Sequence, residues 1–289
     1  TMANFISGWR AIGRSTLVSL RNRTRPALGH LESSSDRSPA LGQNNTFSSM
    51  AVRKQYPEAR ARKALLEADA VCFDVDSTVI QEEGIDVLAE YCGAGEKVAE
   101  LTSRAMGGSM RFQDALAARL DLIRPSKADF LNCLEKQPPK LSPGIKEFIQ
   151  ALHARGTHVY LVSGGFRLMI EPVADKLSIP HSRIYANSVL FDEKEEYTTY
   201  NDEELTSRSG GKAAVVNKIR GENDYKSIVV IGDGVTDMEA RPPADAFIGY
   251  GGVAERAPVK EGADWFIKDF NDLIDQLSSE KAIEDEKAA

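Results

Sequence analysis

The sequence has few cysteines and no long hydrophobic run, and both absences exclude classes of protein. Its three cysteines, Cys72, Cys92 and Cys133, are odd in number and far apart among 289 residues. This pattern argues against a disulfide framework or a zinc site and favours a reducing compartment. The longest apolar runs, such as residues 228–231, are far shorter than the roughly 18 residues that a membrane span needs. We therefore expect no membrane insertion and no disulfide-stabilised secreted fold.

The sequence also lacks an excess of positive charge. Lysine and arginine number 36 and aspartate and glutamate 43, which gives a formal net charge of -7. Because proteins that bind nucleic acids neutralise phosphates with a basic surface, we do not expect a nucleic-acid partner. The hydrophobic share of 42% is ample for a packed core. The length indicates one large domain, or one domain with a smaller insert.

The first 50 residues differ from the rest in composition. Five arginines precede the first acidic residue, Glu32, and serine and asparagine are frequent. This composition is typical of a mitochondrial or plastid transit peptide. A disordered extension, or a start at Met50, would explain it too. We expect residues 1–50 to be a targeting or disordered leader, and the protein to be cytoplasmic unless that leader directs it to an organelle.

Three short apolar segments, at residues 71–73, 159–162 and 228–231, are predicted to be buried strands. Helical patterns at residues 145–153 and 213–219 lie between them. Strands that alternate with helices predict an α/β fold, a Rossmann-like parallel sheet with helices on both faces. We assign residues 66–82 and 140–278 to this core. Ligands of such sheets bind at the carboxyl ends of the strands.

More than 80 residues separate the first two predicted strands, which is too long for a single crossover. Residues 83–139 are predicted to form several helices, which glycines at 93, 95, 107 and 108 interrupt. We interpret this segment as an inserted helical cap over the site. The charged residues 279–289 are predicted to be a flexible tail.

Two aspartates follow the first predicted strand directly. Asp74 and Asp76 are spaced i and i+2, so an extended backbone places them on one face. Two carboxylates so close resist ionising together unless a cation is near, and Mg²⁺ prefers such oxygens. One aspartate could attack phosphorus to form an acyl phosphate, and the other could act as the general acid and base. The alternative is a pair of turn residues that cap the next helix.

Small and acidic residues also follow the other two strands. Asp233, within Gly232–Asp237, could complete a Mg²⁺ site, although an Asp-Gly pair alone is commonly a turn. The segments 163–165 and 209–212 place hydroxyls and backbone amides at the start of helices, where phosphate oxygens can bind. Lys212 could neutralise a transferring phosphoryl group. Plain turns and a solvated surface lysine are the alternatives.

Arg119 and Glu83 indicate which charged groups the substrate carries besides the phosphate. Arg119 falls about 20° from Phe112 on the apolar face of a predicted helix, where an unpaired charge is costly. It could clamp a carboxylate, or extend to the edge of the helix into water. Glu83 could hold a cationic group, or form a solvated acidic pair with Glu82. A cation site, an anion site and a phosphate site together describe a phosphorylated amino acid.

Six motifs carry a resemblance to the haloacid dehalogenase-like superfamily and, within it, to the phosphoserine phosphatases of eukaryotic type. The resemblance extends from about residue 68 to residue 277. The motifs are Asp-Val-Asp-Ser-Thr (74–78), Glu-Gly-Ile-Asp (83–86), Arg-Ala-Met-Gly-Gly (104–108), Leu-Ser-Pro-Gly-Ile (141–145), Ser-Gly-Gly-Phe-Arg (163–167) and Gly-Asp-Gly-Val-Thr-Asp (232–237). The first and the last indicate only the superfamily, whereas the combination with the cap motif is more specific.

The resemblance implies Mg-dependent hydrolysis of O-phospho-L-serine through a phosphoaspartate, the last step of serine biosynthesis, by a chain that can form a homodimer. It implies Asp74 as nucleophile, Asp76 as acid and base, and one Mg²⁺ held by Asp74, the Asp76 backbone carbonyl and Asp233. The implied substrate contacts are Glu83, Met106, Gly107, Arg119, Ser163, Gly164, Gly165, Lys212 and Thr236.

One departure from the family pattern concerns Thr236, and alternative functions stay open. Thr236 stands where many bacterial members have asparagine, which affects only the detail of the phosphate contact because threonine also donates a hydrogen bond. The alternatives for the function are a phosphatase or phosphotransferase of the same superfamily that acts on another small phosphorylated metabolite, and an inactive binding protein.

Overall fold

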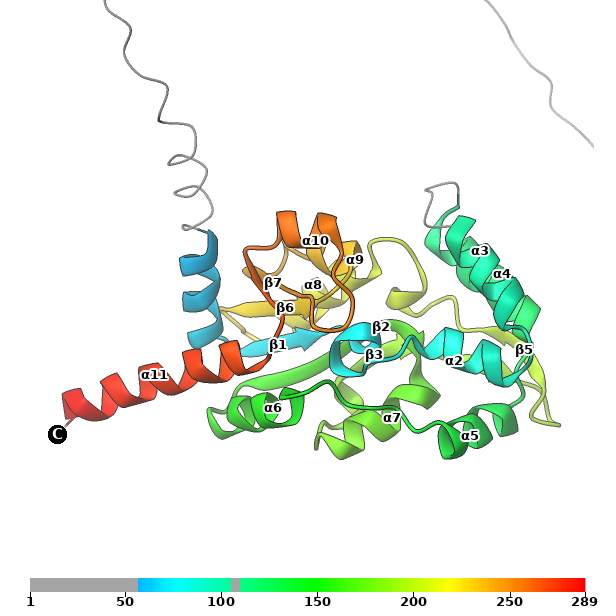
Figure 1. The fold of residues 1–289 in the computed structure, drawn as a ribbon, viewed down its shortest axis with the longest axis horizontal. Coiled ribbons are helices and arrows are strands. Elements are labelled where there is room, and N and C mark those ends of the chain that lie inside the picture. Colours follow the sequence, from blue (N-terminus) through cyan, green and yellow to red (C-terminus); the bar gives the residue numbers. More distant parts are fainter. Residues whose placement is uncertain (1–56, 105–109, 289) are drawn as a thin grey trace, which may run out of the picture. The chain divides into compact units, whose positions relative to one another are not determined.

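The computed structural model describes residues 57–104 and 110–288 (Figure 1). Side chains are described up to Ser279, except that of Arg104. The predicted leader at residues 1–50 and the predicted contacts Met106 and Gly107 lie outside the described residues. Within that described part, no helix is both long enough and apolar enough to cross a bilayer.

A sheet of six parallel strands, in the order β3-β2-β1-β6-β7-β8, forms the centre of the fold. The strands are β1 (Ala70–Phe73), β2 (His158–Phe166), β3 (Ile184–Asn187), β6 (Ile228–Gly232), β7 (Ala246–Tyr250) and β8 (Trp265–Ile267). The three predicted strands are β1, β2 and β6, and they are neighbours in the sheet. The predicted α/β architecture is confirmed.

Each strand buries both of its faces, which is why the sequence there is continuously apolar. In β1, Val71 and Phe73 belong to one hydrophobic cluster, whereas Ala70 and Cys72 belong to the cluster on the opposite face. All four residues are at most 1% exposed. The sheet is therefore the middle of three layers.

Helices cover both faces of the sheet (Figure 1). On one face lie α6 (Ile145–Ala154), α7 (Arg167–Lys176) and α11 (Asn271–Ala288), and on the other lie α8 (Gly211–Glu222) and α10 (Ala257–Gly262), with the short α9 (Val235–Met238) after β6. The helix α11 continues through residues 279–288, where the sequence indicated a tail.

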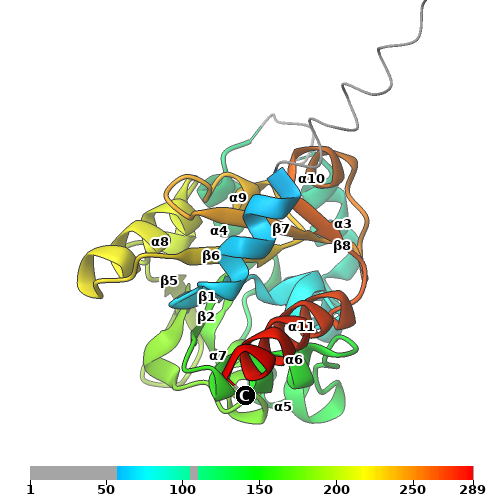
Figure 2. The same ribbon diagram turned by 90° about the vertical axis from the view of Figure 1, so that its left-hand side faces the viewer.

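A helix at residues 57–66 belongs to the packed core (Figure 2, blue, near α11 in red). Its Ala61 and Leu65 are at most 1% exposed and join the cluster on the α6, α7 and α11 side. Arg62 stacks 3.9 Å over the Trp265 ring of β8. The packed structure therefore begins before residue 66, where we expected it to start.

Four helices and a small hairpin form a separate hydrophobic cluster beside the sheet. They are α2 (Gly84–Tyr91), α3 (Gly95–Arg104), α4 (Phe112–Ile123), α5 (Lys127–Lys136), β4 (Val189–Phe191) and β5 (Tyr197–Tyr200). The helix α5 begins where it does because Ser126 and Asp129 form a capping box. The sequence predicted helices here but not the antiparallel hairpin, which contributes Val189 and Tyr197 to the cluster.

Candidate active site

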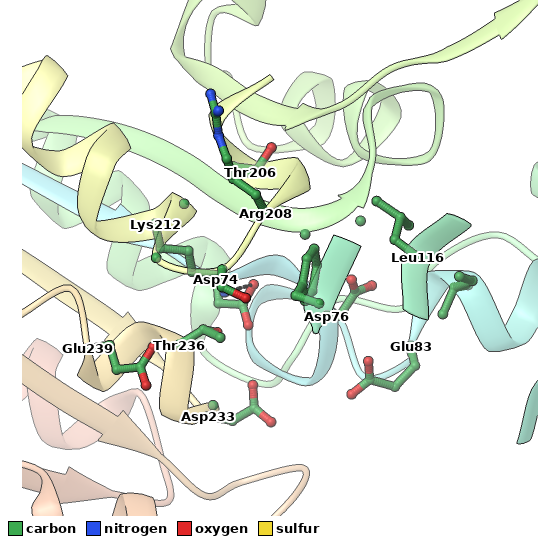
Figure 3. Close-up of a pocket in the computed structure, with 18 of the residues that line it drawn as sticks. Asp74, Asp76, Glu83, Leu116, Thr206, Arg208, Lys212, Asp233, Thr236 and Glu239 are labelled. Carbon is green, nitrogen blue, oxygen red and sulfur yellow. Dashed lines mark ion pairs between the residues drawn. The ribbon is translucent and has the colours of Figure 1, made fainter. Parts of the chain in front are cut away.

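A cavity of about 430 Å³ opens at the carboxyl ends of β1, β2 and β6 (Figure 3). In Figure 3, Asp74, Lys212, Asp233 and Thr236 lie on one side of it, and Glu83 and Leu116 on the other. Of the sequence-predicted residues, its wall contains Asp74, Asp76, Glu83, Arg119, Gly164, Gly165, Lys212, Asp233 and Thr236. Residues from three strand ends and from α4 therefore share one site.

The turn after β1 places two predicted residues, Asp74 and Glu83, in this cavity. The Val75 amide donates to Asp74 Oδ1 over 2.8 Å. Ser77 has a φ of 53°, in the left-handed region that non-glycine residues rarely adopt, and its amide donates to the Glu82 carbonyl. The chain thereby folds back on itself, and the Ser77 hydroxyl donates to Glu83 over 2.8 Å. Such backbone conformations gather at functional sites.

Lys212 lies between two carboxylates. Its Nζ is 2.7 Å from Asp74 Oδ1 and 2.6 Å from Asp237 Oδ1, and the side chain is 11% exposed. Burial lowers the pKa of Lys212, but Asp237 and Asp74 more than reverse this effect and raise it above the ordinary value. Lys212 therefore stays a cation beside the predicted nucleophile.

Three carboxylates form a group that could hold a metal ion. Asp74, Asp233 and Asp237 each offer one oxygen, and these oxygens lie within 4.8 Å of one another. Burial and then the Asp74 charge raise the pKa of Asp237 to about 8. A hard cation would relieve this repulsion, so the oxygen donors fit an ion such as Mg²⁺. The sequence prediction assigned no metal contact to Asp237, although its motif contains this residue.

Asp76 holds a proton more tightly than an ordinary aspartate. The Gly84 amide donates to its Oδ1 over 2.8 Å. Burial first, and then the Glu83 and Asp74 charges, raise the pKa of Asp76 to about 8. A β-carbon at Gly165 would lie 2.8 Å from Asp76 Oδ2, so only glycine leaves room for this carboxyl. The group can therefore donate a proton near neutral pH.

Arg256 is a residue of the site that the sequence analysis missed. Its Nε donates to Asp233 Oδ2 over 2.8 Å, and its Nη2 donates to Glu83 Oε1 over 3.2 Å. Burial raises the pKa of Glu83. Arg256 precedes the short α10 in a polar loop, where neither periodicity nor a motif marks it. Thr206, Arg208 and Glu239 also line the cavity without having been predicted.

Arg119 reaches the cavity from α4. It lines the wall together with Phe112 and Leu116, and the spacing of these residues places them on one face of the helix. Its Nε donates to the Ala115 carbonyl over 3.2 Å. Among the described residues, no carboxylate lies within 4.0 Å of its guanidinium nitrogens. The remaining donors of the fork are therefore available to an anion.

Ser163 does not reach the cavity. It is 0% exposed, and its hydroxyl accepts a hydrogen bond from the Gly165 amide over 2.8 Å. Gly164 and Gly165 do line the wall. A β-carbon at Gly164 would lie 2.9 Å from Phe112 Cζ, so the helix α4 packs directly on this glycine. The backbone of the segment 163–165, rather than its hydroxyl, faces the site.

Comparison with known proteins shows which proteins share these features. The family profile of the haloacid dehalogenase-like hydrolases matches residues 71–240. The chain is 55% identical over 211 residues, 72% of each chain, to "Phosphoserine phosphatase, chloroplastic" of Arabidopsis thaliana. It is 50% identical over 216 residues, 75% of this chain and 96% of the other, to "Phosphoserine phosphatase" of Homo sapiens.

A solved structure described as "Phospho-Aspartyl Intermediate Analogue of Phosphoserine phosphatase" has a TM-score of 0.63 and 25% sequence identity to this chain. The match covers 72% of this chain and 98% of the other. The similarity in fold thus extends over both the sheet and the helices beside it.

We predict that Lys212→Met lowers the free energy of unfolding by about 3–5 kcal/mol, because two buried carboxylates lose their cation. Urea unfolding in the presence of a chelator measures this change. Lys218→Met on the same helix is the control, since Lys218 is 49% exposed and contacts only an exposed glutamate and the face of the Tyr185 ring among the described residues. The additional change Asp237→Asn should recover part of the loss. Equal stability of the Lys212 and Lys218 variants would contradict the prediction.

Proposed function

The chain belongs to the haloacid dehalogenase-like hydrolase family, and we propose that it hydrolyses O-phospho-L-serine to L-serine and phosphate. This reaction is the last step of serine biosynthesis by the phosphorylated route. The observation that carries the proposal is the cavity itself. It unites the Asp74 and Lys212 pair, the protonated Asp76, the acidic Glu83 and the available fork of Arg119.

Each charged group of phosphoserine has a complementary group in the cavity. The phosphate fits beside Lys212 and the backbone of Gly164 and Gly165, and Thr236 can donate to it from the same side. The ammonium fits Glu83, and the carboxylate fits the fork of Arg119. Met106 and Gly107 are also proposed as substrate contacts on the strength of their motif. Ser163 is proposed to support Gly165 through its hydrogen bond with the Gly165 amide.

The chemistry divides between the two aspartates. Asp74 attacks phosphorus, the bond from phosphorus to the serine oxygen breaks, and Asp76 gives its proton to that oxygen. The Asp76 carboxylate then takes a proton from water, and this water attacks the phosphorus of the phosphoaspartate. Phosphate leaves and Asp74 is restored. Lys212 balances the charge of Asp74 and of the phosphoryl oxygens through both steps.

We further propose that one Mg²⁺ binds in the acidic group. The Asp74 and Asp233 carboxylates and the Asp76 backbone carbonyl would hold it, with Asp237 completing the group of carboxylates. When bound, such an ion offsets the negative charge of the phosphoryl oxygens. The raised pKa of Asp237 and the mutual proximity of the three carboxylates support this assignment.

Residues 83–139 are proposed to act as a cap inserted into a core of residues 66–82 and 140–278. The cap supplies Arg119 and Phe112, whereas the core supplies the acids and Lys212. Closure over bound substrate would exclude water until serine leaves, which protects the phosphoaspartate from premature hydrolysis.

The arginine-rich first 50 residues are proposed to direct import into plastids. Their composition and the chloroplastic relative support this proposal. We predict that the full chain fused to a fluorescent protein accumulates in the plastids of plant cells, whereas the chain that starts at Met50 stays in the cytosol. Microscopy of the two fusions checks this. The same distribution for both would refute a targeting role, and mitochondrial import of the full chain would correct the compartment.

We predict that Asp74→Asn abolishes phosphate release from O-phospho-L-serine, because an amide cannot form the acyl phosphate. A phosphate-release assay with Mg²⁺ measures turnover, and a chelator should stop the unmodified enzyme. Asp224→Asn is a suitable control, since Asp224 is exposed and does not belong to the cavity wall. Turnover by Asp74→Asn would remove the nucleophile assignment.

The role of Arg119 can be tested with two esters that differ only in a carboxylate. We predict that Arg119→Ala lowers kcat/KM about 100-fold for O-phospho-L-serine, since a charge-assisted clamp is lost. O-phosphoethanolamine has no carboxylate, so its kcat/KM should change less than about threefold. Arg111→Ala is the control, because Arg111 pairs with the exposed Asp114 outside the cavity. Equal losses for both esters would favour another small phosphorylated metabolite as the substrate.

A further inference from the structure

Asn187, at the end of β3, joins two loops of the active site without lining the cavity itself. It is 0% exposed. Its Nδ2 donates to the Gly164 carbonyl over 2.7 Å, and its Oδ1 accepts from the Thr206 hydroxyl over 2.9 Å. Because a carbonyl can only accept, the amide nitrogen must face Gly164 and the hydroxyl of Thr206 must donate. An amide makes both bonds at this position, whereas an ionised carboxylate could only accept.

The first of these bonds spans a break in the sheet. The strands β2 and β3 pair regularly up to Val162 and Tyr185, and the next pair is Phe166 with Asn187. Three residues of β2, at 163–165, therefore face one residue of β3, and they leave the regular ladder. The side chain of Asn187 replaces the missing ladder bond at Gly164. It thereby holds the backbone segment that faces the proposed phosphate site.

The second bond leads to Lys212. Thr206 belongs to a turn at Leu205–Ser207 that packs against the start of α8. The Leu205 carbonyl oxygen lies 2.1 Å from the place where a β-carbon of Gly211 would be. The Leu205 carbonyl therefore lies directly against the Gly211 backbone, with no space for a side chain between them. A displacement of Thr206 would therefore reach Gly211 and the adjacent Lys212.

We propose that Asn187 is a positioning residue, which fixes the distance between the Gly164–Gly165 backbone and the Lys212 ammonium. These are the two protein sides of the phosphate subsite, so the inference rests on the proposed function. Gly165 also lies against the Asp76 carboxyl, so a shift of this backbone would disturb the acid as well. Asn187 touches neither substrate nor metal, and it acts only through the two loops.

Asn187→Asp tests the proposal at a pH where the introduced carboxyl is ionised, since it keeps the shape and its carboxylate can only accept where Asn187 donates to Gly164. We expect inorganic phosphate, titrated into the full chain with Mg²⁺ by calorimetry, to bind at least tenfold more weakly, as the loss of an oriented buried hydrogen bond implies. We expect kcat/KM for O-phospho-L-serine to fall about 100-fold, because a small misplacement of catalytic groups has effects of this size. A purely structural role would lower Tm and leave phosphate affinity unchanged.

Thr206→Val provides a second variant, which keeps the shape of this residue at the cavity wall and removes the hydroxyl that donates to Asn187. It should weaken phosphate binding about tenfold, and it decides the question if Asn187→Asp does not fold. Asn223→Asp is the matched control, because it makes the same substitution at a residue whose amide donates to the Ile219 carbonyl, at the far end of α8 from Lys212. Its phosphate affinity should stay within about twofold.

Three outcomes would overturn the proposal: unchanged phosphate affinity in folded Asn187→Asp, unchanged affinity in Thr206→Val, or an equal loss in Asn223→Asp. Failure of the proposed function is a separate result, since it would appear as an unmodified enzyme that releases no phosphate from O-phospho-L-serine. The comparison of phosphate affinities between variants does not depend on that activity.

Discussion

The buried contact of Lys212 with Asp74 and Asp237 is the constraint on which the rest of the site depends. Four aspartates, at positions 74, 76, 233 and 237, converge near two cations, Lys212 and Arg256. Negative charge is therefore in excess before a phosphate group arrives. The structure meets this excess by raising the pKa of Asp76 to about 8 and by grouping oxygens that suit a metal ion. Both responses are what phosphoryl transfer requires, since it needs an acid for the leaving oxygen and positive charge around the phosphoryl group.

The order of the strands explains why so much of the site could be predicted. The strands β2, β1 and β6 are neighbours, and each ends in a loop of small or acidic residues. A parallel sheet brings these carboxyl ends to one edge, so motifs far apart in sequence must meet there. The apolar runs and the spacing of Asp74 and Asp76 were visible as local patterns. Ser163 was predicted to face the substrate, but the pairing of its hydroxyl with the Gly165 amide turns it inward, and no local pattern shows this.

What could not be predicted depends on contacts between distant segments. Arg256 follows Asp233 by 23 residues, and only the folded chain brings it to Asp233 and Glu83. The hairpin of β4 and β5 joins the cluster of α2 to α5 through tertiary packing, and the helix at residues 57–66 joins the core through Ala61, Leu65 and the stacking of Arg62 on Trp265. Arg119, in contrast, was recognisable because a charge in the middle of an apolar face conflicts with its surroundings. A conflict of this kind within one helix is visible in sequence, whereas a complementary partner elsewhere in the chain is not.

The same geometry explains which elements of the fold supply the groups that take part in chemistry and which supply the groups proposed to recognise the amino acid. Groups that take part in chemistry come from strand ends and the start of α8, where the backbone is fixed by the sheet and by close glycine contacts. Groups proposed to recognise the amino acid come from α4 and from the turn after β1. The sheet does not fix every part of the site, because the ladder between β2 and β3 is interrupted between Val162 and Phe166, at the backbone proposed to bind phosphate. The buried side-chain amide of Asn187 hydrogen-bonds this backbone in place of the missing ladder bond. It also connects this backbone to the turn that lies beside Lys212. The geometry of the proposed phosphate subsite therefore depends on a side chain that the substrate does not contact.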